Sequence, residues 1–108
     1  MSDGMTIQEI SVDELAELLE QGATLVDVRE PDEYEAARVP GGTLVPLATV
    51  PDRLDAFDAD GPTYVICRSG ARSMRACEFV AAQGREVVNV AGGTLAWIES
   101  GRPVDSGA

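Results

Sequence analysis

The pattern that most restricts the fold is the direct succession of a strand, a tight polar loop and a helix over residues 63–83. Residues 63–66 are β-branched, aromatic or aliphatic, which is typical of a short buried strand. Residues 67–73 read CRSGARS, and the apolar spacing after them predicts a helix over residues 72–83 that stops at Gly84. A strand that passes directly into a helix is the repeating unit of α/β domains.

The rest of the chain repeats this alternation. Further strands are predicted over residues 5–10, 24–29, 43–45 and 86–90, and further helices after the capping box of Ser11 and Glu14 and over residues 31–35, 50–57 and 94–100. This order predicts an α/β domain with a mostly parallel central sheet of about five strands and helices on both faces. The 108 residues fit a single domain, for which we expect a core over residues 7–104 and short flexible termini.

Cys67 is the predicted reactive group, because chemistry in such sheets gathers at the carboxyl ends of the strands. The loop after it would aim backbone N–H groups and a helix N-terminus at the sulfur, which favours the nucleophilic thiolate. A buried core cysteine is the alternative, but the flanking arginines and glycine do not suit a core position. Cys77 does suit one, since it shares an apolar helix face with Met74 and Val80, and we interpret it as a core side chain rather than a resolving thiol.

The charged residues limit both the activation of Cys67 and the choice of partners. The chain has 19 acidic residues and 8 basic ones, which are all arginine, and it has no histidine. Without histidine the usual general base and the commonest metal ligand are missing, so we expect neither a metal nor another cofactor. The net charge of −11 disfavours nucleic acid and membrane surfaces as partners. Two cysteines and an N-terminus without a signal-peptide pattern predict a reducing, cytoplasmic location.

Four motifs follow one another along the chain: Leu25-Val26-Asp27-Val28-Arg29-Glu30 with Glu33-Tyr34, Val39-Pro40-Gly41-Gly42, Cys67-Arg68-Ser69-Gly70-Ala71-Arg72-Ser73, and Asn89-Val90-Ala91-Gly92-Gly93 with Ala96-Trp97. Together they resemble the motifs of single-domain rhodaneses, a family of sulfurtransferases, over residues 7–104. The resemblance implies a rhodanese α/β fold and a cysteine that takes sulfane sulfur from thiosulfate or a similar donor and passes it to cyanide or a thiol. One departure is Ala37-Arg38, where the family usually has Gly-His, and it bears on local packing or substrate preference.

The residues around Cys67 suit a persulfide, which is an anion that needs hydrogen-bond donors. We expect Arg68 and Arg72 either to bind the negative charge of the donor or to shape the loop. The predicted substrate-binding set is the loop itself: Arg68, Ser69, Gly70, Ala71, Arg72 and Ser73. Asp27 and Arg29, at a neighbouring strand end, are predicted to brace the site through an ion pair or hydrogen bonds, and Asn89 to bind a loop.

Three functions fit this site. The first is a sulfurtransferase that works by double displacement through a Cys67 persulfide, and the second is a persulfide carrier that relays sulfur to a thiol-bearing protein. The third is a phosphatase or an arsenate-reductase-like enzyme, in which five residues separate the cysteine from the arginine. Only four residues separate Cys67 from Arg72, and Ile66 stands where a phosphatase often has histidine, so the sequence favours sulfur over phosphate.

Overall fold

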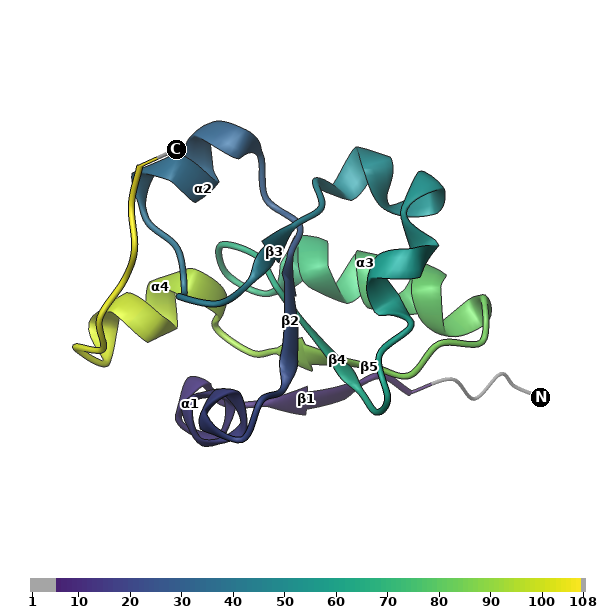
Figure 1. Ribbon diagram of the computed structural model, residues 1–108, viewed down its shortest axis with the longest axis horizontal. Coiled ribbons are helices and arrows are strands. Elements are labelled where there is room, and N and C mark those ends of the chain that lie inside the picture. Colours follow the sequence, from purple (N-terminus) through teal and green to yellow (C-terminus); the bar gives the residue numbers. More distant parts are fainter. Residues whose placement is uncertain (1–5, 108) are drawn as a thin grey trace.

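The computed structural model describes residues 6–107, which form five strands, four α-helices and two 3-10 segments (Figure 1). In chain order these are β1 (Gln8–Ile10), α1 (Val12–Glu20), β2 (Thr24–Asp27), α2 (Pro31–Ala36), β3 (Thr43–Leu44), η1 (Leu47–Asp52), η2 (Leu54–Phe57), β4 (Thr63–Ile66), α3 (Ala71–Ala82), β5 (Val87–Val90) and α4 (Gly93–Glu99). All strand pairs are parallel, in the sheet order β1-β5-β4-β2-β3. The predicted α/β class and the five-stranded sheet are therefore confirmed.

Alternation along the strands divides the core into two halves, one on each face of the sheet. On β4 and just after it, Val65 and Cys67 point to the half of the core that α3, η1 and η2 cover. Tyr64 and Ile66 point to the other half, beneath α1 and α4. Successive side chains of a strand face opposite ways, so both faces of this central strand are buried and apolar, as a doubly covered parallel sheet requires. Helices on both faces are thus also confirmed.

Several predicted boundaries were wrong by a residue or more. Helix α3 begins at Ala71, one residue before the predicted start. Strand β2 ends at Asp27 and not at Arg29, because the N–H of Arg29 donates to the Asp27 carboxylate instead of a neighbouring strand. The predicted helix over 50–57 is two 3-10 segments with Pro51 inside the first, where Arg53 donates to the Val50 carbonyl three residues back. The first strand was predicted from Met5, which lies outside the described residues, as do residues 1–4 and 108 of the termini.

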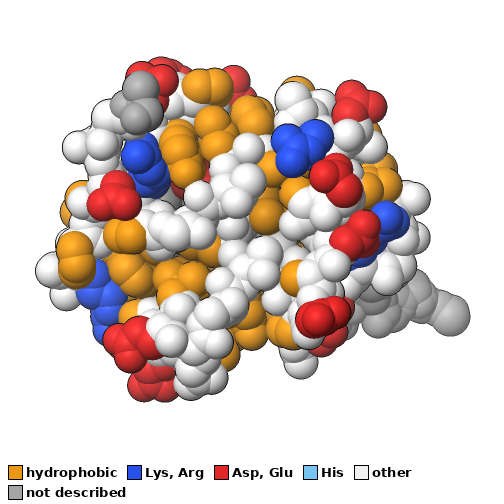
Figure 2. All heavy atoms as spheres, in the orientation of Figure 1, with side chains coloured by type: hydrophobic (Ala, Val, Ile, Leu, Met, Phe, Trp, Pro, Cys, Tyr) orange, Lys and Arg blue, Asp and Glu red, His pale blue; other side chains and the backbone are white. Residues whose placement is uncertain are grey.

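Charged side chains of opposite sign lie next to one another around the periphery of the face shown in Figure 2, whose middle is neutral or apolar. The ion pairs include Arg85 with Asp58 at 2.9 Å and Arg102 with Asp13 at 2.8 Å. Such exposed pairs each add little to stability. In the described chain, every helix is too short or too polar to cross a membrane.

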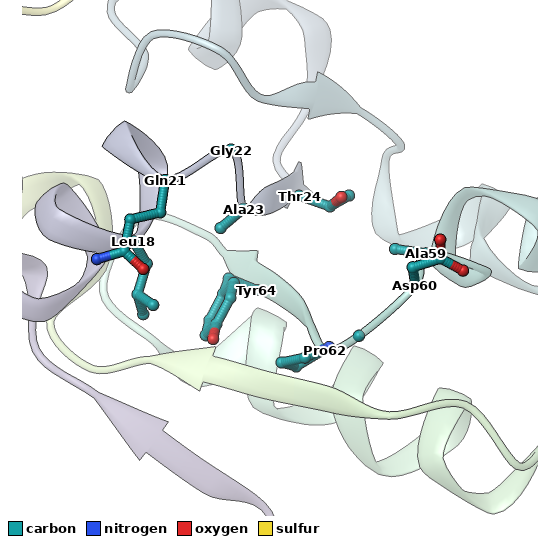
Figure 3. A pocket seen from close by; sticks show the side chains of 10 residues that line it. Leu18, Gln21, Gly22, Ala23, Thr24, Ala59, Asp60, Pro62 and Tyr64 are labelled. Atoms are coloured by element: carbon teal, nitrogen blue, oxygen red, sulfur yellow. The ribbon is translucent and has the colours of Figure 1, made fainter.

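A cavity of about 280 Å³ lies at the amino ends of β2 and β4 (Figure 3). Its wall includes Leu18 and Gln21 of α1, Thr24 at the start of β2, Asp60 in the turn before β4, and Tyr64. Because the strands are parallel, this cavity lies at the opposite end of β4 from Cys67, and none of its lining residues is a nucleophilic cysteine. We therefore do not assign the reactive site to this cavity, despite its volume.

Candidate active site

The active loop, residues 67–70, joins the carboxyl end of β4 to the first turn of α3. Gly70 is the residue that permits this tight connection, because its φ of 109° lies in the left-handed region that side chains resist. It serves as the N-cap of α3 without a capping side chain. The helix therefore starts directly beside the cysteine, with its free N–H groups at that end.

The Cys67 sulfur is surrounded by hydrogen-bond donors of its own loop. The Gly70 N–H donates to Sγ of Cys67 at 3.1 Å, and the Ser73 Oγ lies 3.3 Å from the same sulfur. Cys67 as a whole is only 1% exposed. Burial by itself raises the pKa of the thiol, but the side chain and N–H of Ser73 and the N–H groups of Gly70 and Ser69 together lower that pKa below its ordinary value. The loop thus favours a thiolate without histidine.

Cys77 has the opposite environment. It is fully buried in the apolar core beneath α3, and burial together with nearby negative charge raises the pKa of its thiol to about 12. A thiol with so high a pKa is protonated at neutral pH and is a poor nucleophile. Its buried position agrees with its interpretation as a core side chain.

The start of α4 holds the active loop from the other side. The N–H and the hydroxyl of Thr94 donate to the Cys67 carbonyl at 2.9 and 3.0 Å, and the Leu95 N–H donates to the Arg68 carbonyl at 3.1 Å. Gly93 makes this approach possible, because a side chain there would lie 2.5 Å from the Cys67 carbonyl oxygen. The sequence reasoning missed Thr94, although the glycine pair before it signals a close backbone approach.

Asn89 is the second support of the loop. From β5 its amide nitrogen donates to the Gly70 carbonyl at 3.2 Å and to the Glu9 carboxylate at 2.8 Å. Asn89 is fully buried, and it binds the loop as its sequence position predicted. Together with Thr94, it fixes the loop backbone at both ends.

Asp27 and Arg29 form a buried ion pair at the carboxyl end of β2. Arg29 Nη2 lies 2.8 Å from Asp27 Oδ2, and the side chains are 5% and 2% exposed. The guanidinium also donates to the main-chain carbonyls of Ala37 at 2.8 Å and of Glu33 at 3.3 Å. In the described chain no hydrogen bond of this pair reaches residues 67–73. Arg29 is linked to that segment only indirectly, because Glu33, whose carbonyl it binds, also binds Arg72.

Arg72 is bound by a carboxylate that the sequence analysis did not assign to the site. Its two terminal nitrogens donate to the two carboxylate oxygens of Glu33 in α2 at 2.7 and 2.9 Å. Arg68, in contrast, is exposed, and its guanidinium makes no hydrogen bond or ion pair with residues 6–107. The two arginines thus differ: Arg72, in the first turn of α3, ties α3 to α2, and Arg68, in the active loop, has its charge available.

Glu33→Gln is expected to lower the free energy of unfolding by about 1 kcal/mol at pH 7, a modest loss because the two side chains are 27% and 33% exposed. The hydrogen bond from Arg72, although opposed by burial, lowers the pKa of Glu33 from 4.5 to about 2. A lowered native pKa stabilises the fold above pH 4.5, and this contribution disappears as the pH falls through 2. Urea unfolding from pH 7 to pH 2 measures the difference between variant and wild type.

Glu17→Gln is the matched control, because Glu17 is exposed on α1 and has no ion pair with a described residue. It should leave stability nearly unchanged at every pH. If the loss of unfolding free energy in Glu33→Gln stays constant from pH 7 to pH 2, the ion pair with Arg72 is not its cause.

Arg38, the departure from the family pattern, lies outside the loop. Its Nη1 donates to the carbonyls of Tyr34 at 3.1 Å and Gly107 at 2.7 Å, and its guanidinium stacks on the Tyr34 ring. Its backbone also pairs with Asp105. Arg38 therefore fastens the C-terminal segment to α2, which is a packing role.

Comparisons with known proteins agree with this geometry. The family model of the rhodanese-like domain matches residues 11–100. A sulfurtransferase of Allochromatium vinosum is 34% identical over 91% of this chain and 94% of its own length, and the thiosulfate sulfurtransferase GlpE of Pseudomonas aeruginosa is 33% identical over 90% and 87%. The crystal structure of a rhodanese-related protein from Thermoplasma volcanium has a TM-score of 0.83 and 33% identity over 90% of this chain and 96% of that one. This chain therefore belongs to the rhodanese-like domain family.

Proposed function

We propose that this protein is a sulfurtransferase that moves sulfane sulfur from thiosulfate to cyanide or a thiol through a persulfide on Cys67. The observation that carries the proposal is the Cys67 sulfur, which receives the Gly70 N–H and the Ser73 hydroxyl and whose pKa is lowered by its loop. The name of GlpE, a relative at 33% identity, supports thiosulfate as the donor.

The reaction is a double displacement. The Cys67 thiolate attacks the outer sulfur of thiosulfate, the sulfur–sulfur bond of the donor breaks, and sulfite leaves with the electron pair of that bond. The persulfide that remains has one negative charge, for which the loop's N–H groups are suitable donors. Cyanide or a thiolate then attacks the outer sulfur and restores the Cys67 thiolate. Since the thiolate is already favoured, no general base is needed.

The engagement of Arg72 argues against a phosphatase. A phosphatase of related architecture uses the arginine after its cysteine to hold the phosphate, and here both terminal nitrogens of Arg72 bind Glu33. Arg68 is the arginine left to attract an anionic donor. The short loop, whose N–H groups converge on the Cys67 sulfur, suits the outer sulfur of a persulfide better than the larger phosphate group of an ester.

The direct test is intact-mass measurement after exposure to thiosulfate, followed by the addition of acceptors. The expected result is the gain of one sulfur atom on Cys67 and its loss on addition of cyanide or a small thiol. A persulfide that small acceptors do not discharge would indicate a carrier for a protein partner instead. Absence of the added sulfur would refute the proposal.

Arg68→Ala is expected to raise the KM for thiosulfate about tenfold with little change in kcat, because a charge-assisted hydrogen bond contributes about 1.5 kcal/mol. The unfolding midpoint should not change, since the guanidinium is exposed and makes no bond to a described residue. Steady-state kinetics of sulfur transfer to cyanide measures both constants.

Arg75→Ala is the matched control for this substitution. Arg75 is also an exposed arginine without a bond to a described residue, but it lies on the solvent side of α3, away from the buried Ser73 face. Its removal changes the net charge equally and should leave KM nearly unchanged. Equal rises of KM in both variants would show a general charge effect and would exclude Arg68 as the donor-binding residue.

A further inference from the structure

A second cavity lies at the reactive end of the sheet, between α2 and α4. Its volume is about 190 Å³, and we call it the α2–α4 cavity. Its wall includes the end of α2, one face of α4 and the first loop residue after the cysteine: Ala36, Ala37, Thr94, Leu95, Ile98 and Arg68. It is smaller than the roughly 300–1,000 Å³ of typical small-molecule pockets, so it fits a short ligand.

Arg68 is the charge in this wall that has no partner among the described residues. The two other charged lining residues are engaged elsewhere: Arg29 with Asp27, and Glu33 with Arg72. Five arginines of the described chain pair with a carboxylate, whereas Arg68 is exposed and pairs with none among the described residues. The α2–α4 cavity therefore offers one free positive charge, on the residue that directly follows Cys67 in the chain, and this charge suits a ligand with a negative group.

The rest of the wall is apolar and exposed. Leu95 and Ile98, three residues apart on α4 and hence on the same side of the helix, are 40% and 45% exposed. Ala36 and Ala37 face them across the cavity from the end of α2. Neither thiosulfate nor cyanide has a hydrocarbon group that such a wall could bind. The apolar wall therefore contributes nothing to the binding of thiosulfate or cyanide, and it indicates an organic substrate.

We propose that the α2–α4 cavity binds the sulfur acceptor, and that this acceptor is an organic thiol with a carboxylate beside its sulfur and a short aliphatic tail. The inference rests on the proposed function. The carboxylate would bind Arg68, and the tail would lie against Leu95 and Ile98. The acceptor thiolate attacks the outer sulfur of the Cys67 persulfide, the bond to Sγ breaks, and its electron pair remains on Sγ as the thiolate. A thiol that arrives protonated gives its proton to water.

The test is the rate at which the persulfide, prepared with thiosulfate and freed of excess donor, is discharged by three thiols. These are 2-mercaptohexanoate, which has carboxylate and tail, mercaptoacetate, which lacks the tail, and 2-mercaptoethanol, which lacks the charge. Compared per thiolate, 2-mercaptohexanoate should react about tenfold faster than mercaptoacetate, since several methylene groups become half-buried. In Ile98→Ser this advantage should fall to about twofold, while the rate of persulfide formation from thiosulfate stays the same.

Val104→Ser is the control, because Val104 is 39% exposed but does not line the α2–α4 cavity. It should keep the full preference for the tail. Both variants should unfold at nearly the wild-type urea concentration. A wild type without a preference for the tail, or a preference that survives both Leu95→Ser and Ile98→Ser, would overturn the inference.

Binding of hexanoate, which has no thiol, separates this inference from the proposed function. It should cause saturable shifts of the Leu95 and Ile98 methyl signals in NMR spectra, and these shifts should be absent in Arg68→Ala. A protein that binds hexanoate here but forms no persulfide would refute sulfur transfer and keep the cavity as a carboxylate site. A protein that forms the persulfide but shows neither hexanoate binding nor tail preference would refute only the acceptor site.

Discussion

Cys67→Ser is expected to abolish the transfer of sulfur from thiosulfate to cyanide, leaving only the uncatalysed background. The loop makes a nucleophile by lowering the pKa of a thiol, through the hydroxyl and N–H of Ser73 and the N–H groups of Gly70 and Ser69. A serine hydroxyl stays protonated with the same donors around it, and its oxygen forms no persulfide. The measurements are the steady-state rate and the intact mass after exposure to thiosulfate, in which no sulfur should be gained.

Cys77→Ser is the control within the same chain. Cys77 is fully buried, its thiol pKa is about 12, and it is engaged only in packing. The variant should keep most of the activity and should lose about 1–2 kcal/mol of stability, because a hydroxyl without a partner is buried in an apolar core. Full activity of Cys67→Ser, or loss of activity in a folded Cys77→Ser, would overturn the assignment of the nucleophile.

The position of Cys67 between a strand end and a helix start could be predicted, because the residues that determine it are consecutive in the chain. A buried strand, a loop with a glycine at its left-handed position and a helix start are all readable from residues 63–73. The class of the fold follows for the same reason, since each strand and helix is a local pattern. The order of the strands in the sheet and the shape of residues 47–57 depend on packing between distant segments, and the predicted helix there was wrong.

Two other contacts around the active loop could not be predicted, because they join parts of the chain that are distant in the sequence. Glu33 binds Arg72 across 39 residues, and Thr94 binds the Cys67 carbonyl across 27. No local pattern marks Glu33, and the glycine pair before Thr94 signals a close backbone approach without showing which segment approaches. The sequence therefore predicts the same alternatives for Arg68 and Arg72, and the contact with Glu33 distinguishes Arg72.

The placement of charge around the active loop suggests why residues 67–73 contain two arginines. Arg72 and Glu33 neutralise each other while they join α3 to α2, so this pair adds rigidity without adding net charge near the sulfur. Arg68 adds charge without adding rigidity. Under the proposed transfer from thiosulfate, one free positive charge would attract the anionic donor, and a second one would hold the anionic sulfite longer.

Gly93→Ala is expected to displace the active loop. A methyl group there would lie 2.5 Å from the Cys67 carbonyl oxygen and 2.6 Å from that of Arg68, and the φ of 60° is already in the left-handed region. The free energy of unfolding should fall by about 3 kcal/mol, from the left-handed strain and the weakened hydrogen bonds of Thr94 and Leu95. Activity should fall at least tenfold, and the pH at which iodoacetamide modifies Cys67 should move upward.

Gly101→Ala distinguishes loop displacement from backbone strain alone. Gly101 also has a left-handed φ, of 82°, but an added methyl group there would meet nothing within 4 Å. It should cost about 1 kcal/mol of stability and leave both activity and the reactivity of Cys67 unchanged. If Gly93→Ala does not fold, Thr94→Val tests the same contact more gently, because it removes only the hydroxyl bond to the Cys67 carbonyl.

Wild-type reactivity of Cys67 in both Gly93→Ala and Thr94→Val would mean that α4 does not hold the active loop. The hydrogen-bond donors around the Cys67 sulfur would then be positioned by α3 and Asn89 alone.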